Sequence, residues 1–224
     1  MSTQLDEALS AAEQALAAGQ LIVLPTDTVY GIAADALQAD AVQALLDAKR
    51  RGRDMPPPVL IAEPAMLRAL VADVPPEVDA LINRFWPGAL TLIMKAQASL
   101  RMDLGRTEGT IAVRVPDHAD ARAVLRRVGP LAVSSANTSG QPPATTVDEA
   151  IAQLGASVSV YLDGGPTPGP VASTIIDLAS ITTGRIVRAG MIGFGELVDV
   201  LPQLEDVPAP EASPHPEDAP TSDA

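Results

Sequence analysis

The sequence predicts one α/β domain in which helices flank a twisted, mixed β-sheet. Patterns of apolar residues at helical spacing alternate along the chain with short apolar runs of about 4–8 residues, which is typical of helices and buried strands. Several of these runs end abruptly in hydroxyl, amide or charged side chains, as strands do where an α/β fold builds a ligand site. Hydrophobic residues make up 47% of the 224 residues and aromatic residues only 2%. The core must therefore be built from Ala, Val, Leu and Ile.

The chain opens with an acidic amphipathic helix, expected over 3–18 with Ser2 or Thr3 as its cap and Gly19 as its stop. This stretch lacks the positive start and apolar centre of a signal peptide. Further helices are expected over 39–49, 64–71, 77–84, 118–128 and 147–154. Strands are expected at 21–24, 59–62, 89–94, 110–115, 131–134, 158–162, 173–178 and 185–188.

A polar cluster follows the strand expected at 131–134, where the chain reads LAVSSANTSGQPPAT. Such a run after a buried strand indicates a ligand loop whose side chains donate hydrogen bonds without adding charge. Its donors are Ser134, Ser135, Asn137, Thr138 and Ser139. An Asx or hydroxyl turn that satisfies only its own backbone explains the same residues equally well. Taken alone, the cluster leaves both interpretations open.

A second polar strand end lies near the N-terminus, where the run LIVL breaks at Pro25 into TDTVYG. Two hydroxyls and a carboxylate again stand where a strand stops, which makes coincidence a weaker explanation of the first cluster. Both segments therefore favour a shared site at one edge of the sheet.

Positive charge is concentrated at three places. The densest cluster, KRRGR, runs from Lys49 to Arg53 after a helical pattern. A solvated helix end explains this cluster equally well, because cations interact favourably with the C-terminal end of the helix dipole. Arg114 stands inside the strand TIAVR, where it faces either water or a cavity. Arg188 closes the short apolar strand RIVR. A guanidinium can bind a carboxylate or phosphate through two parallel N–H bonds, so the arginines suit an anionic ligand.

An ordered set of motifs resembles the YrdC/Sua5 family, the L-threonylcarbamoyladenylate synthases. The motifs are PTDTVYG, KRR, FWPGALTLIMK, TIAVRVPDH, SSANTSG, DGGP and STIID, and the similarity runs over residues 8–191. The chain looks like the short form, with one YrdC-like domain over 1–202 and too few residues after 191 for the second domain of the Sua5 branch. The resemblance implies a sheet and helices arranged around a positively charged cavity.

The resemblance also implies a reaction. Family members condense L-threonine, bicarbonate and ATP to threonylcarbamoyl-AMP and pyrophosphate, which feeds the threonylcarbamoyladenosine (t6A) modification of tRNA. Such a nucleotidyltransferase (EC 2.7.7.87) needs no protein nucleophile, because positioning and electrostatic stabilisation suffice, with Mg2+ screening the triphosphate. A cytoplasmic enzyme that hands its product to a separate tRNA threonylcarbamoyl transferase is expected.

By resemblance, the threonine site falls on Thr28, Arg114, Ser135 and Ser173. The nucleotide site falls on Lys49, Arg51, Thr110, Asn137, Thr145 and Arg188. Among these, Lys49, Arg51 and Arg114 are expected to carry the catalytic charge, and no metal ligands can be assigned. Met55, Leu60 and Ala172 depart from the family pattern, and Arg53 is a candidate to replace a lost cation.

Residue usage excludes several kinds of site. The chain has no cysteine, which excludes disulfides, thiolate metal sites and a cysteine nucleophile. Its two histidines are too few for a His-rich metal centre. His118 stands at an expected helix start, where a surface or capping role is expected, and His215 lies in the C-terminal tail. The apolar runs are also far shorter than the ~20 residues that a membrane span needs.

The net charge of −13 argues against a protein whose main role is to grip a nucleic-acid backbone. Part of that charge belongs to an acidic tail rich in Pro and Ala, expected over 203–224 and expected to be disordered. Two alternatives to the synthase stay open on the sequence. One is a YrdC-like paralogue that activates another carbamoyl acceptor, and the other is a non-catalytic module that contacts double-stranded RNA or tRNA. Scarce aromatic residues count against the second.

Overall fold

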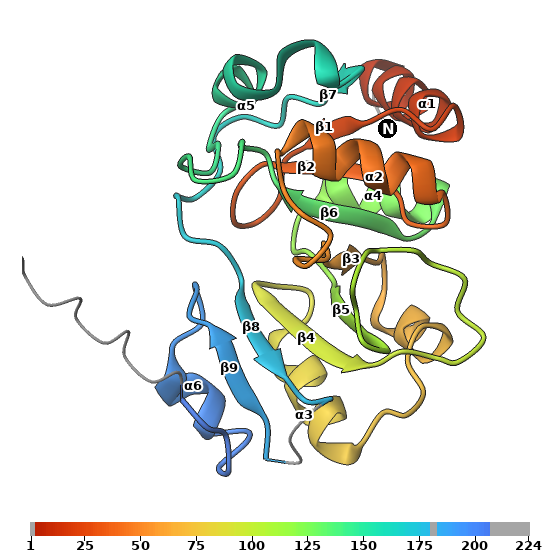
Figure 1. Ribbon diagram of the computed structural model, residues 1–224. Coiled ribbons are helices and arrows are strands. Elements are labelled where there is room, and N and C mark those ends of the chain that lie inside the picture. Colours follow the sequence, from red (N-terminus) through yellow and green to blue (C-terminus); the bar gives the residue numbers. More distant parts are fainter. Residues whose placement is uncertain (1–2, 180–182, 207–224) are drawn as a thin grey trace, which may run out of the picture.

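The computed structural model describes residues 3–179 and 183–206, and in them nine strands form one mixed sheet in the order β7-β1-β2-β6-β3-β5-β4-β8-β9 (Figure 1). The strands are β1 (Ile22–Leu24), β2 (Gly31–Asp35), β3 (Val59–Leu60), β4 (Leu90–Lys95), β5 (Thr110–Arg114), β6 (Leu131–Ser135), β7 (Val160–Tyr161), β8 (Thr174–Asp177) and β9 (Arg185–Arg188). Parallel pairs (β1 with β7, β3 with β5, β4 with β8) are mixed with antiparallel ones. The expected fold class is therefore confirmed.

The helices are α1 (Thr3–Ala17), α2 (Ala39–Ala48), α3 (Pro76–Phe85), α4 (Ala119–Val128), α5 (Val147–Leu154) and α6 (Phe194–Val198). Short 3-10 segments occupy Pro64–Ala69 and Gly155–Ser157. The segment at Pro64–Ala69 was expected to be an α-helix over 64–71. It winds instead as a 3-10 helix, the tighter form that connecting segments often adopt.

One half of the sheet is covered by helices on both faces. The alternation of strand β1 shows how this works, because successive side chains of a strand point to opposite faces. Ile22 and Leu24 pack into the cluster that contains α1 and α4, whereas Val23 packs into the cluster that contains α2 and α5. Strand β2 repeats the pattern, with Ala33 on one side and Ile32 on the other. This half is therefore a rigid three-layer support.

The other half of the sheet is covered on one face only. Leu90, Leu92 and Met94 of β4 point into a core shared with α3 and α6, and Ile111 and Val113 of β5 join them. The side chains between these positions face the opposite way. They line the cavity described below, so the strand period itself creates the site.

Strand β2 and helix α6 were not expected from the sequence. The residues GIAAD of β2 contain a single β-branched side chain, and the strand is buried on both faces, so it lacks the alternation that marks a half-exposed strand. Helix α6 has only five residues, too few for a helical period to be read.

One minor expectation is confirmed. The imidazole of His118 accepts a hydrogen bond from the Ala121 amide as the N-cap of α4, at 3.4 Å. Trp86 is buried in the core, and its indole N–H donates to the Leu90 carbonyl at 2.7 Å.

The C-terminal part of the fold reaches beyond residue 202. Leu204 is buried, and the backbone of Glu205 exchanges hydrogen bonds with Gly184 and Ile186. The rest of the expected tail, including His215, lies outside the described residues, as does the candidate cap Ser2. Among residues 3–179 and 183–206, no helix is long and apolar enough to cross a bilayer.

Candidate active site

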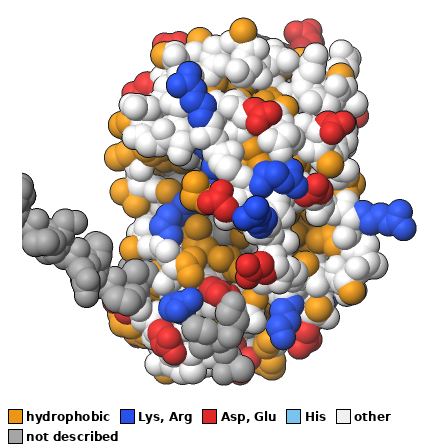
Figure 2. Space-filling view, viewed as in Figure 1, with side chains coloured by type: hydrophobic (Ala, Val, Ile, Leu, Met, Phe, Trp, Pro, Cys, Tyr) orange, Lys and Arg blue, Asp and Glu red, His pale blue; other side chains and the backbone are white. Residues whose placement is uncertain are grey.

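A cavity of about 660 Å³ lies on the uncovered face of β5, β4 and β8, beside the end of β6. In Figure 2, basic and hydrophobic side chains border a hollow near the middle of the molecular face. The polar residues that line the cavity are Thr28, Tyr30, Arg51, Asp54, Thr91, Thr107, Thr110, Arg114, Ser134, Ser135, Ser173 and Arg188.

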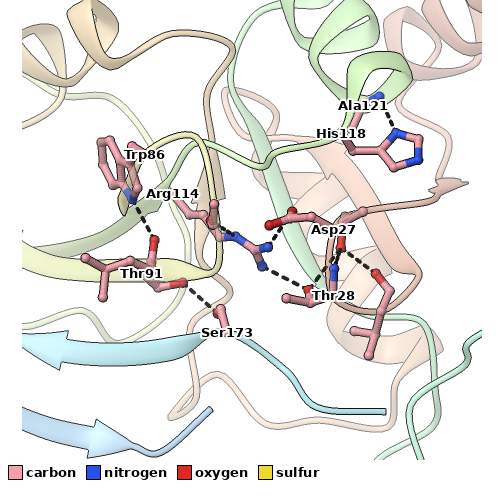
Figure 3. Close-up of polar contacts among 12 residues, drawn as sticks. Asp27, Thr28, Trp86, Thr91, Arg114, His118, Ala121 and Ser173 are labelled. Carbon is pink, nitrogen blue, oxygen red and sulfur yellow. Dashed lines mark hydrogen bonds and ion pairs between the residues drawn. The ribbon is translucent and has the colours of Figure 1, made fainter. Parts of the chain in front are cut away.

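Arg114 lies at the end of β5 and is buried, with 6% of its surface exposed. Its Nε donates to the Gly88 carbonyl at 2.9 Å, its Nη1 to the Thr28 hydroxyl at 3.1 Å, and its Nη2 to Asp27 at 2.6 Å (Figure 3). Burial lowers the pKa of the Arg114 guanidinium, and the Asp27 carboxylate opposes that shift. Three of the five N–H donors are thus occupied, and two remain for a ligand.

Thr28 is oriented by its neighbours so that it can only accept a hydrogen bond from a ligand. The Thr26 hydroxyl donates to the Val29 carbonyl at 2.6 Å, so Thr28 must supply the proton in the 3.0 Å bond between the two threonine hydroxyls. Arg114 then donates to Thr28. Thr28 is left with one lone pair and no proton, which suits an ammonium or hydroxyl donor on a ligand.

Thr91 and Ser173 form the opposite kind of group. Their hydroxyls lie 2.8 Å apart, on β4 and just before β8, and both are buried (Figure 3). Arg188 Nη2 donates to the Ser173 hydroxyl at 3.0 Å, and a guanidinium cannot accept a hydrogen bond in return. When one of the two hydroxyls donates to the other, the second hydroxyl still has an O–H that is free to donate. The pair therefore offers a single neutral donor to the cavity.

Arg188 is held against Ser173 at the end of β9. Its Nε and Nη2 donate to the Ser173 carbonyl at 3.1 and 2.7 Å, and the guanidinium is part-buried although the residue as a whole is exposed. Burial, followed by the charges of Arg114 and Arg51, lowers the pKa of Arg188. Arg114 and Arg51 therefore repel the charge of Arg188 across the cavity, and cations gathered in this way suit an anionic ligand.

Arg51 follows helix α2 and reaches the cavity wall. Its Nη1 donates to the Ser134 hydroxyl at 3.2 Å, whereas its buried Nε has no hydrogen-bond partner. Burial lowers the pKa of Arg51, and Asp54 opposes the shift. A buried N–H without a partner is costly, and an anionic ligand in the cavity would satisfy it.

Three of the predicted nucleotide-binding residues do not line the cavity. Lys49 is buried at the end of α2, where its ammonium group donates to the carbonyls of Ser135 and Asn137. The Asn137 carboxamide donates to the carbonyls of Thr138 and Gln141, at 2.9 and 2.8 Å. The Thr145 hydroxyl donates to Glu149 at 3.0 Å. The other predicted residues, Thr28, Arg51, Thr110, Arg114, Ser135, Ser173 and Arg188, line the cavity together.

The residues at which the sequence departs from the family pattern line the cavity, whereas the residue expected to compensate for them does not. Met55, Leu60 and Ala172 line the cavity. Arg53, the candidate replacement cation, instead forms an ion pair with Asp103 and donates to Gln43 at 2.8 Å. It does not line the cavity, so its geometry favours a role in joining two loops.

Tyr30 ties the loop at 163–165 to the site. Its hydroxyl donates to the Gly165 carbonyl at 2.7 Å and accepts from the Gly164 amide at 3.1 Å. Burial raises the pKa of the Tyr30 phenol, so it stays protonated as this arrangement requires. The predicted DGG motif is therefore fixed to the segment that carries Thr28.

Thr91 and Asp27 were not identified as site residues from the sequence. Thr91 left a readable signal, because it is the one hydroxyl inside the apolar strand LTLIM. Asp27 was seen as part of the polar strand end, but its partner could not be named before the fold was known.

No group of three or more His, Cys, Asp or Glu side chains in the described part of the chain could hold a metal ion. The hydrogen-bond donors of the cavity side chains are guanidinium and hydroxyl groups, which suit the oxygens of an anion, and Asp54 is the carboxylate in the lining.

Relatives of the chain were found by sequence. The Sua5/YciO/YrdC family model, which carries the description "Telomere recombination", matches residues 14–190. A protein of Mycobacterium leprae named "Putative threonylcarbamoyl-AMP synthase" is 50% identical over 193 residues, which cover 86% of this chain and 87% of the relative. The threonylcarbamoyl-AMP synthase of Bacillus subtilis is 38% identical over 178 residues, which cover 78% of this chain and 51% of that protein.

A solved structure agrees with this result. The crystal structure of Sua5 from P. abyssi in complex with L-threonine superposes with a TM-score of 0.87 at 32% sequence identity. The match covers 93% of this chain, which spans 61% of that protein. Together with a family model that matches most of the sequence, this likeness means that the chain belongs to the Sua5/YciO/YrdC family.

Proposed function

We propose that the protein is a threonylcarbamoyl-AMP synthase. It condenses L-threonine, bicarbonate and ATP to threonylcarbamoyl-AMP and pyrophosphate, for the t6A modification of tRNA. The observation that carries this proposal is the gathering of Arg51, Arg114 and Arg188 around one cavity whose other polar side chains are hydroxyls and the single carboxylate of Asp54. Relatives with this name match most of the chain, and a related structure holds L-threonine.

In the proposed reaction, the amine of threonine and bicarbonate form a carbamate with loss of water. A carbamate oxygen then attacks the α-phosphorus of ATP, and the bond to the departing pyrophosphate breaks. Every substrate brings negative charge, so the protein must supply fixed cations at the right places. Preorganised charge of this kind lowers the barrier because it does not have to reorganise during the reaction.

The threonine subsite is assigned to Thr28, Arg114, Ser135 and Ser173. The two remaining donors of Arg114 can hold the carboxylate, since a guanidinium and a carboxylate match in geometry. Thr28 can accept a hydrogen bond from the substrate, and the pair of Thr91 and Ser173 can donate one. An acceptor at Thr28 and a donor at the pair of Thr91 and Ser173 would distinguish the amine and hydroxyl donors of threonine from its carboxylate oxygens.

The nucleotide subsite is assigned to Arg51, Thr110 and Arg188, which line the cavity. Lys49, Asn137 and Thr145 belong to the predicted set but lie outside the lining. The free Nε of Arg51 suits a phosphate oxygen. Mg2+ is proposed to arrive with the triphosphate, and it would screen the charge of the phosphates. Bulky apolar side chains in the lining, such as Ile93 and Ile175, would help to exclude water from the labile intermediates.

The test is to mix the protein with ATP, Mg2+ and bicarbonate, with and without L-threonine, and to measure pyrophosphate release. Release that needs both threonine and bicarbonate, and that falls at least about a hundredfold in Arg114→Lys, supports the synthase. Lysine keeps the charge but loses the planar pair of donors. Arg101→Ala is the control, because Arg101 is exposed and does not line the cavity.

Turnover without threonine would favour a paralogue with another carbamoyl acceptor, and the absence of any pyrophosphate release would refute the synthase. Circular dichroism of Arg114→Lys shows whether the variant keeps its fold. A cytoplasmic location and delivery of the product to a separate tRNA threonylcarbamoyl transferase complete the proposal. Direct transfer would be seen as product that stays bound until a transferase is added.

A further inference from the structure

Lys49 makes an unusual set of contacts for a residue expected to bind nucleotide. Its ammonium group is buried, with 2% of the residue exposed, and donates to the carbonyls of Ser135 and Asn137, the latter at 2.7 Å. It also lies 3.5 Å from the carboxamide oxygen of Asn137. The carbonyl of Lys49 accepts a hydrogen bond from the Ser139 amide at 2.8 Å. Both ends of this one residue therefore hold the segment 135–139.

The segment 135–139 begins at the cavity wall. Ser135 lines the cavity, and the preceding Ser134 is contacted by Arg51, which follows Lys49 closely in the chain. The chain just after α2, which ends at Ala48, thus places the Lys49 side chain behind the cavity wall and the Arg51 side chain in the cavity lining. The negative ends of two carbonyl dipoles of this segment are thus bound by the ammonium group of Lys49.

We propose, on the basis of the function proposed above, that Lys49 is a positioning residue: it fixes segment 135–139 and couples that segment to anion binding through Arg51. The ammonium does not touch the nucleotide. The residue acts by holding the carbonyls of Ser135 and Asn137, and its charge adds to the field that Arg51 presents to the cavity.

The electrostatic surroundings support this coupling. Burial, together with the charge of Arg51, lowers the pKa of Lys49 to about 8. Arg51 is the charged group that acts on Lys49, and segment 135–139 contributes carbonyl, amide and hydroxyl groups but no charge. An anion bound at Arg51 would offset the repulsion between the two cations. Anion binding would therefore raise the pKa of Lys49, and protonation of Lys49 would strengthen anion binding.

The chain is well suited to a direct test, because Lys49 and Lys95 are its two lysines. Protein labelled with carbon-13 at the lysine side chains is titrated by NMR with and without the α,β-methylene analogue of ATP and Mg2+. The Lys49 signal is expected to titrate below the ordinary lysine range and to move upward when the analogue binds. The signal of Lys95, which is exposed at the end of β4, serves as the internal reference.

Two variants separate positioning from direct contact. Lys49→Met removes the charge with little change in length, and Lys49→Arg keeps a charge that does not titrate in this range. Lys49→Met is expected to shift the backbone amide signals of residues 135–139 without any ligand, and to weaken binding of both the analogue and L-threonine about tenfold. In wild type the affinity for the analogue falls as the pH rises through 8, whereas in Lys49→Arg it does not. Lys95→Met is the matched control.

The proposal is overturned if Lys49→Met leaves the amide signals of residues 135–139 unchanged while the analogue alone binds more weakly, because that pattern means direct contact. It is also overturned if Lys49 titrates like Lys95 and does not respond to the analogue. These readouts need no turnover. An inactive wild type would therefore refute the synthase, and the result on Lys49 would still be interpretable.

Discussion

The guanidinium of Arg114 lies 2.6 Å from the carboxylate of Asp27, and both side chains are largely buried. Asp27 comes from the loop between β1 and β2, whereas Arg114 ends β5, so the ion pair joins the two halves of the sheet. This contact fixes the orientation of the arginine before any ligand is present. Preorganisation of this kind is what an anion site requires.

Removal of the Asp27 charge is expected to be costly. Asp27→Asn leaves Arg114 as a buried cation without its counter-ion, which should destabilise the fold by about 3 kcal/mol and raise KM for L-threonine. Urea unfolding and steady-state kinetics measure the two effects. Asp103→Asn is the control, because its ion pair with Arg53 is exposed and should contribute less than about 1 kcal/mol. Equal losses in both variants would contradict this account.

The free O–H donor that the pair of Thr91 and Ser173 offers to the cavity gives a second prediction. Thr91→Val removes one hydroxyl from the pair. Ser173 keeps its hydrogen bond from Arg188 but loses its hydrogen bond with Thr91. We expect KM for L-threonine to rise about fivefold to tenfold, the effect of one lost hydrogen bond. Thr91→Ser keeps the hydroxyl and should stay within about twofold of wild type. Identical kinetics in the two variants would show that the hydroxyl is not used.

Gly105 allows two loops at the cavity to meet. A Cβ atom there would lie 2.6 Å from the Arg53 carbonyl, and its φ of +110° is unfavourable for other residues. Gly105→Ala should therefore cost more than the ~1–3 kcal/mol of backbone strain alone and should weaken nucleotide binding. Gly109→Ala isolates the strain, since Gly109 has a φ of +77° and an open environment. Chemical denaturation of both variants makes the comparison, and a smaller loss in Gly105→Ala would contradict it.

The pH dependence of stability should run opposite to that of nucleotide affinity. Since the pKa of Lys49 is lowered from 10.5 to about 8, the unfolded chain binds more protons than the folded one between those values. Stability must then rise with pH across that window, by up to about 3 kcal/mol relative to Lys49→Met, which carries no titratable group. Urea unfolding from pH 7 to pH 10 measures the difference, and a constant difference would refute the lowered pKa.

Much of the fold could be predicted because its strands are short, apolar and β-branched. Strands at 110–114 and 185–188 begin where their patterns place them, and α5 matches its expected range. Strand β2 could not be predicted, because small residues buried on both faces carry no period of two. The sheet order also depends on contacts between distant segments, which a local pattern does not encode.

The candidate site was predictable in its residue types more than in its geometry. The hydroxyl runs and the arginine inside TIAVR marked the cavity, and Arg114 does face it. For Lys49, the sequence placed a cation at the helix end but not the side toward which its ammonium points. That direction depends on segment 135–139, which lies 86 or more residues away along the chain.

The central claim is that this protein joins threonine, bicarbonate and ATP in one product. The most direct test supplies carbon-13 bicarbonate with ATP, Mg2+ and L-threonine, and measures by mass spectrometry the adenylate that forms. The account predicts one carbon-13 atom in an adenylate that also contains threonine, and its loss in Arg114→Lys. An adenylate without the label, or no adenylate at all from folded wild-type protein, would contradict it.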